Sequence, residues 1–400
     1  MNGSSLAARL ESPATVRAAG LLALGAFLYL LLAGRSIDLL GSPSRMGLVL
    51  AWAAVAAAFW LTGRASVVVA YLVIGGLLMR WVELPAGGAG PSDVLAAINE
   101  AIAVWFGGGN PYDHFYEATR PAGQPMPYPP GALLVHLPGY AASGLAGVQL
   151  TEFVLAGVAM VALAALGTTV SWLAALPALA IYAGASNLVL LATDGSNDTG
   201  VGALVLIAII ALGWSIDHGL DDASLMLAGI WAALAVSSKQ IALPLVLVLA
   251  IYLVRRHGWR PARRYLAAAG AILLLISIPF LLQGPVTYVE GLFRFVGVHE
   301  DIYGWNIWAF AQGMGWTPWD QGPATILNVV VSAIALLALL VLPLRRPSGA
   351  LLAGVAALLV VLLSARWTTY AYFALLAPVV LALPAVAIWE ARRSAEAIPS

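Results

Sequence analysis

Long apolar runs separated by short polar segments dominate the chain. The run from Phe153 to Ile216 holds only two charged residues, Asp194 and Asp198, and the runs 321–344, 347–365 and 367–388 hold none. A helix needs about 20 apolar residues to cross the roughly 30 Å hydrocarbon core of a bilayer. The pattern therefore predicts one all-α integral membrane domain over residues 1–400, with about 12 transmembrane helices. The expected spans are 18–34, 46–62, 65–82, 150–167, 169–185, 199–215, 223–238, 240–254, 265–283, 325–343, 349–364 and 369–389.

Two apolar runs admit more than one interpretation. Residues 18–34 follow Arg9 and Arg17, as a signal peptide would, but we interpret them as a retained helix because the sidedness of the later helices requires it. Residues 131–147 are apolar but contain His136 and Pro138. If they crossed the membrane, every earlier helix would change direction, so we expect them to form a helix in the outer interface.

The composition supports an integral membrane protein. The chain is 62% hydrophobic and 10% charged, whereas a soluble domain carries about 25% charged residues. The absence of cysteine excludes disulfides, thiolate catalysis and cysteine-based zinc sites. The formal net charge is zero, which gives no indication of a nucleic-acid partner.

The arginines predict the orientation. Arg255, Arg256, Arg260, Arg263 and Arg264 form the densest basic cluster, and basic residues concentrate in cytoplasmic loops. Counting spans from this loop puts both termini in the cytoplasm and leaves 12 of the 19 basic residues inside. Two long segments, 83–149 and 284–324, are then external. We expect the active site in the first of them, in a multi-pass protein of the cell membrane.

The first external segment contains a predicted helix. Ser92 has the character of a helix cap, and Asp93 opens the helix. An apolar stripe from Val94 to Phe106 follows, which we expect to lie in lipid. Glu100 lies two turns after Asp93 on the opposite, polar face. Spacing alone also allows a non-functional interpretation, in which Asp93 is a first-turn acid favoured by the helix dipole and Glu100 is a solvated residue.

A metal site is a weaker alternative in this segment. Asp113, His114 and Glu117 carry suitable ligand atoms, but no known ligand spacing singles them out. We expect neither a metal nor a cofactor.

Lys239 is the only lysine, beside 18 arginines. It lies between two apolar runs, where a charge is costly and usually functional. A lysine binds phosphate as a compact point charge, although a residue at a helix end also snorkels to the interface. Arg366 is expected on the same side as Lys239, where it could bind a phosphate together with Lys239 or anchor the chain at the interface beside Trp367 and Tyr370.

The second external segment combines polar and aromatic residues. His299 precedes Tyr303, Trp305 and Asn306. Aromatic rings beside polar groups suit sugar stacking, and they also suit an interfacial belt.

The order of these motifs resembles a known family. An acid that opens a helix, then Gly108-Gly109-Asn110-Pro111-Tyr112, then Tyr128-Pro129-Pro130 resembles the GT-C glycosyltransferases. The chain is most similar to the GT87-like mannosyltransferases, which use polyprenyl-phosphate mannose. The resemblance continues in residues 194–198, in Ser238-Lys239-Gln240 and in Gly304-Trp305-Asn306, and covers roughly residues 90–310. It differs from the family in having two additional helices before the first external loop.

This resemblance implies Asp93 as the catalytic base of an inverting transfer. Lys239 and Arg366 would bind the donor phosphate. The partners expected are a polyprenyl-phosphate sugar donor, a lipid or glycan acceptor, and membrane lipids, without nucleic acid. A secondary transporter or lipid flippase is the alternative, although no internal repeat and no mid-membrane relay of ionisable residues is evident. The residues expected around the substrate are Glu100, Tyr112, Asp113, His114, Tyr128, Asp194, Asn197, Asp198, Gln240, His299, Asn306 and Tyr370.

Overall fold

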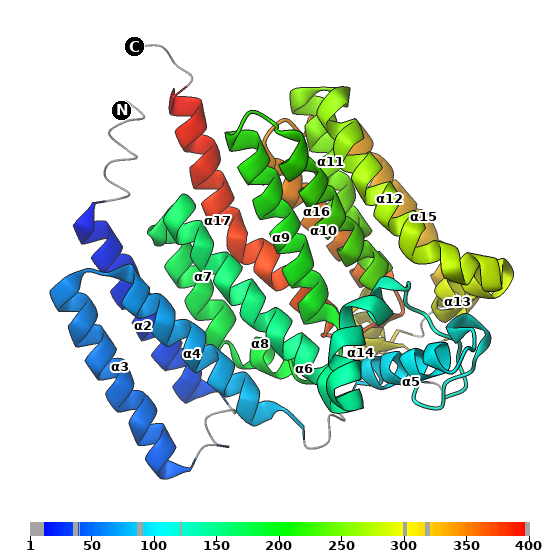
Figure 1. The fold of residues 1–400 in the computed structure, drawn as a ribbon, viewed down its shortest axis with the longest axis horizontal. Helices are drawn as coiled ribbons and strands as arrows, with labels where there is room; N and C mark the ends of the chain where they lie inside the picture. Colours follow the sequence, from blue (N-terminus) through cyan, green and yellow to red (C-terminus); the bar gives the residue numbers. More distant parts are fainter. Residues whose placement is uncertain are drawn as a thin grey trace.

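The computed structural model is a bundle of helices (Figure 1). It describes residues 12–34, 39, 41–85, 90, 92–120, 122–298, 302–316 and 321–396. Within these residues, ten helices are long and apolar enough to cross a membrane. The all-helical class is therefore confirmed. These ten are α2 (Pro13–Ala33), α3 (Ser42–Thr62), α4 (Ala65–Glu83), α6 (Gly131–Thr169), α9 (Asp198–Asp217), α11 (Leu243–His257) with the turn before it, α12 (Trp259–Gln283), α15 (Gln321–Val341), α16 (Pro347–Ser364) and α17 (Tyr372–Glu396).

The other two expected spans form shorter helices, α7 (Trp172–Gly184) and α10 (Asp222–Ser238). The chain breaks after α7 at Ala185, which is extended, and continues as α8 (Ser186–Leu191). Arg80 of α4 is fully buried and donates hydrogen bonds to the carbonyl oxygens of Tyr182 (2.7 Å) and Ala183 (3.2 Å). This arginine satisfies carbonyls that the end of α7 leaves without helical partners.

The expected helix at residues 131–147 is the first part of α6. The helical backbone is interrupted at Ser143 and Gly144, and Gly144 has a φ of 59°. The chain folds back so closely that a Cβ on Gly139 would lie 2.1 Å from the carbonyl oxygen of Gly147. A hydrogen bond between His136 and Glu152 (3.0 Å) joins the two parts. This helix therefore packs against protein on its buried face, and the second part of α6 forms the long span.

The two ends of the bundle differ (Figure 1). At one end lie the start of α2, the last turn of α17 and the turn between α11 and α12, which carries the arginine cluster. At the other end lie α5 (Val94–Phe106), α13 (Pro285–Val298) and α14 (Ile307–Gly313). Helix α5 and the arginine cluster therefore lie at opposite ends of the bundle.

Two short strands depart from the all-α pattern. β1 (Tyr303–Gly304) pairs in parallel with β2 (Trp367–Thr368). The pairing joins the chain before α14 to the chain between α16 and α17. Short helical turns η3 (Pro111–Asp113) and η4 (Gln240–Ala242) complete the elements described.

The lipid-facing stripe predicted for α5 is wrong for most of its length. Val94, Leu95, Ile98 and Ile102 are buried in a cluster with tyrosine and phenylalanine rings of other segments. Only Phe106, at the end of the helix, is strongly exposed. The first part of α6 and the loop after α5 cover the stripe, because an apolar face is buried equally well by protein as by lipid.

Candidate functional site

A polar cavity of about 290 Å³ lies at the end of the bundle that carries α5. It contains six of the residues expected from the sequence, namely Asp93, Tyr128, Asp194, Asp198, Lys239 and Tyr370. The remaining lining residues are Ser92, Val94, Arg120, Ser196, Tyr303, Trp367, Thr369, Ala371 and Tyr372. Motifs separated by nearly 280 residues of sequence therefore meet in one cavity.

The loop before α9 positions the start of α5. The backbone N–H of Ser92 donates to the carbonyl oxygen of Asp194 (2.7 Å), and that of Leu95 donates to Gly195 (2.8 Å). Gly195 has a φ of 88°, a left-handed conformation that favours glycine. Gly90 packs so tightly here that an added Cβ would lie 2.3 Å from the Asp194 carbonyl oxygen. Backbone hydrogen bonds and close packing therefore hold the two motifs together.

Asp93 occupies the cap position of α5, and its side chain is held from another loop. The Oδ2 atom accepts a hydrogen bond from the backbone N–H of Arg120 (2.7 Å). Burial raises the pKa of the Asp93 carboxyl, and the Arg120 N–H and the charges of Arg120 and Lys239 offset part of this rise. A raised pKa makes the carboxylate a stronger base than an exposed aspartate.

Lys239 follows α10 and is almost completely buried. Its Nζ atom donates to Oδ2 of Asp198 (2.7 Å), the first residue of α9. The ammonium also lies 4.6 Å from the centre of the Tyr372 ring and 5.5 Å from that of Tyr128. A snorkelling lysine would extend toward the interface, whereas this one points into a paired, aromatic environment. The buried pairing with Asp198 therefore shows that Lys239 does not snorkel.

Asp194 is a second buried carboxylate. Its Oδ1 atom accepts from the backbone N–H of Ser196 (2.8 Å). Burial raises the pKa of Asp194 to about 6, although the hydrogen bonds from Ser196 oppose the shift. Asp198 keeps one buried oxygen, Oδ1, with no hydrogen-bond partner among the described residues. Both carboxylates are therefore held in the cavity at a cost to stability.

Several predicted substrate residues support the cavity from outside. Tyr112 is buried and donates to the carbonyl oxygen of Tyr128 (2.8 Å). Asn197 donates to the carbonyl oxygen of Ser238 (3.2 Å), beside Lys239. Gln240 donates to the carbonyl oxygen of Pro127 (3.0 Å). These side chains fix the backbone of cavity-lining segments.

Other predicted residues lie elsewhere. Glu100 and His114 do not line the cavity; Oε1 of Glu100 lies 3.4 Å from Nε2 of His114. Asp113 is exposed. Asn306 caps α14 and donates to the carbonyl oxygen of Arg366 (2.9 Å). His299 lies outside the described residues.

The side chain of Arg366 does not line the cavity, although Trp367 does. Successive side chains of a strand point to opposite faces, and Trp367 begins β2. In place of the arginine, this segment contributes Trp367, Thr369 and Tyr370 to the cavity.

Arg120 is the cation that sequence reasoning missed. The Arg120 side chain is exposed at the cavity, and its backbone N–H donates to the Asp93 carboxylate. It is the only lysine or arginine between residues 83 and 149, and this isolation was the available signal. Trp367 and Tyr372 were also missed as lining residues, because their approach depends on the β1–β2 pairing and the start of α17.

The cavity thus presents a basic carboxylate, two further acids, two cations and several aromatic rings. Within the part of the chain that the structure describes, no three histidine or acidic side chains gather as metal ligands. Comparison with protein-family models, with curated proteins and with solved structures finds no match for this chain.

Proposed function

We propose that this protein is an inverting membrane glycosyltransferase. It transfers a sugar, mannose by resemblance, from a polyprenyl-phosphate donor to a hydroxyl of a lipid or glycan acceptor. One observation carries the proposal: a carboxylate with a raised pKa shares a cavity with two cations and aromatic rings. A base, a phosphate-binding group and a sugar-stacking surface are the components that this reaction needs.

The reaction step follows from these positions. The Asp93 carboxylate accepts the proton of the acceptor hydroxyl while the acceptor oxygen forms a bond to the anomeric carbon. The bond between that carbon and the phosphate oxygen breaks, and its electron pair leaves with the polyprenyl phosphate. The transition state has oxocarbenium character, as in glycosyl transfer generally. The leaving group is already a phosphate, so no strong general acid is required.

Two cations are available to stabilise the departing phosphate. Lys239 uses one of its three N–H donors on Asp198 and lines the cavity. Arg120 offers a planar guanidinium from the opposite loop, a geometry that suits bidentate phosphate binding. We assign the donor phosphate to the space between them. Arg366, which the sequence suggested for this role, is replaced by Arg120 in the proposal.

The position of the cavity favours an enzyme over a transporter. The polar cavity lies where α9, α10 and α17 begin or end, at one end of the bundle. A transporter site lies near the bilayer midplane, between repeated halves. We place this end outside the cell and both termini in the cytoplasm, because the arginine cluster lies at the opposite end.

The direct test is an assay with purified protein. Radiolabelled polyprenyl-phosphate mannose is supplied with a panel of lipid and glycan acceptors. We expect acceptor-dependent release of polyprenyl phosphate and a labelled product of inverted anomeric configuration. Donor that stays intact with every acceptor, together with protein-dependent movement of the labelled lipid across vesicles, would contradict the proposal in favour of a flippase.

A further inference from the structure

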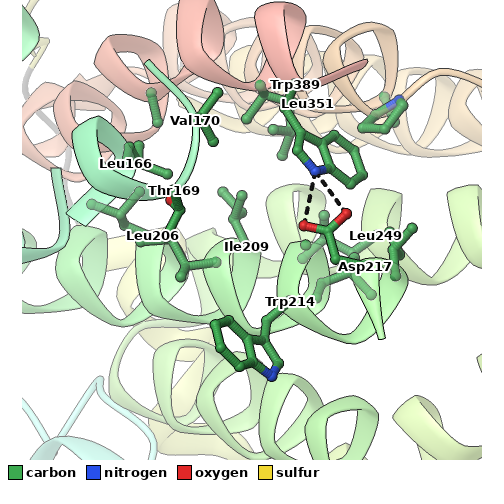
Figure 2. Close-up of a pocket in the computed structure, with 18 of the residues that line it drawn as sticks. Leu166, Thr169, Val170, Leu206, Ile209, Trp214, Asp217, Leu249, Leu351 and Trp389 are labelled. Atoms are coloured by element: carbon green, nitrogen blue, oxygen red, sulfur yellow. Dashed lines mark hydrogen bonds between the residues drawn. The ribbon is translucent and has the colours of Figure 1, made fainter. Parts of the chain in front are cut away.

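A second cavity lies at the arginine-rich end of the bundle, far from the proposed active site. Its walls are apolar and come from α6, α9, α11, α16 and α17. Figure 2 shows Leu166 and Val170 on one side and Leu351 and Trp389 on the other, with Ile209 between them. All five helices are candidate membrane spans. The molecules that reach such a slot from its surroundings are lipids.

The mouth of this slot is basic. An adjoining cavity shares Ile216, Tyr252, Pro347 and Trp389 with the slot. Its remaining lining residues are Arg256, His257, Arg345, Arg346, Glu390, Arg393 and Ser394. The apolar slot therefore opens beside four arginines and one glutamate.

Internal pairing neutralises only part of this charge. Arg393 contacts Asp217 (2.7 Å), which also accepts from the Trp389 indole, as Figure 2 shows. Arg346 lies 3.5 Å from Glu390. Arg256 and Arg345 form no ion pair with any described carboxylate. Two positive charges thus remain at the mouth of an apolar slot.

We propose that this composite cavity binds an anionic phospholipid of the surrounding leaflet. One acyl chain occupies the slot between α9 and α17, and the phosphate lies between Arg256 and Arg345. Basic pockets between membrane helices are a known arrangement for anionic lipid head groups. Trp389 and Tyr252 line both cavities, and aromatic side chains of this kind lie at the head-group level of a bilayer. The site is independent of the proposed transferase activity.

The slot can be filled without disturbing the fold. Gly213 lines it, and a Cβ built on this residue meets no atom within 4 Å. Leucine also favours a helix more than glycine does. Gly213→Leu therefore blocks the chain site, and Gly270→Leu, on α12 and equally free of contacts, is its matched control. Arg256→Gln/Arg345→Gln removes the free charges, with Arg260→Gln as control.

The experiment measures thermal protection of delipidated protein in neutral detergent during titration with dioleoyl phosphatidylglycerol. Saturable protection is expected, with none from dioleoyl phosphatidylcholine or from chainless glycerol phosphate. Each free arginine is worth about fivefold in affinity, so the double variant should bind about 25-fold more weakly. Gly213→Leu should lose most of the protection, while both controls keep it.

Three results would overturn the proposal. Equal protection by phosphatidylcholine would show that the lipid's negative charge is not recognised. Equal protection by glycerol phosphate would show that the acyl chain is not needed for binding. Equal affinity of Gly213→Leu and Gly270→Leu for phosphatidylglycerol would place the lipid elsewhere.

Discussion

Replacing Asp194 by asparagine should stabilise the protein in a pH-dependent way. Burial raises the pKa of Asp194 from 3.8 to about 6. The folded state therefore holds a proton that the unfolded state releases between these two values. Folding stability consequently falls as the pH rises through this window, and the deficit persists above it. A shift of about 2 units corresponds to about 3 kcal/mol at pH 8. Asparagine carries no charge and can still accept the hydrogen bond from Ser196.

The assay is denaturant unfolding in detergent at pH 4 and pH 8. We expect Asp194→Asn to be more stable than the wild type by about 3 kcal/mol at pH 8, with most of the difference gone at pH 4. Asp113→Asn, at an exposed carboxylate outside the cavity, is the control and should change little. A pH-independent difference, or a less stable Asp194→Asn at pH 8, would contradict this prediction.

Three further predictions concern the site and its orientation. Lys239→Ala should destabilise the protein by about 3–5 kcal/mol, because it leaves Asp198 buried and unpaired, while Lys239→Ala/Asp198→Ala should recover stability without recovering donor binding. Unfolding titrations measure the stability and donor titrations measure the affinity; unchanged donor affinity in either variant would contradict the phosphate role of Lys239. Single cysteines at positions 122 and 258 of this cysteine-free chain should react with an impermeant reagent on intact cells only at 122, and the reverse result would invert the topology. Transfer should begin to fall on the acid side at a higher pH than an ordinary aspartate would give, because the raised pKa of Asp93 protonates the base earlier; a rate profile flat down to pH 4 would contradict this.

Much of the helical architecture could be predicted because the apolar runs have the length of the bilayer. The run 153–216 contains so few charges that spanning helices were expected, because a helix satisfies its own backbone groups in lipid. The gathering of Asp93, Asp198 and Lys239 also followed from the sequence, since each lies where a helix begins or ends on the same predicted side. Helix ends on one side of a bundle lie within reach of one another.

The features that were missed depend on contacts between distant segments. The break after α7 requires Arg80, which in sequence resembles a residue at a helix end and in the structure is buried against carbonyl groups from α7. The pairing of Tyr303 with Trp367 has no local signal. The stripe of α5 was correctly recognised as apolar, but a hydrophobic period does not distinguish a lipid environment from a protein one.

Asp93 is the base in the proposed transfer. Asp93→Asn preserves the size of the side chain and an oxygen that can accept the hydrogen bond from Arg120, but it removes the basicity. A general base contributes about 10² to 10⁴-fold to a rate. Glu100→Gln is the matched control, because Glu100 lies on the same helix and contacts His114 outside the cavity.

The measurement is the turnover of both variants with polyprenyl-phosphate mannose, with melting temperatures recorded in parallel. We expect Asp93→Asn to lose about 10² to 10⁴-fold in turnover while remaining folded, and Glu100→Gln to stay close to the wild type. Turnover near the wild-type value in a folded Asp93→Asn protein would contradict the mechanism.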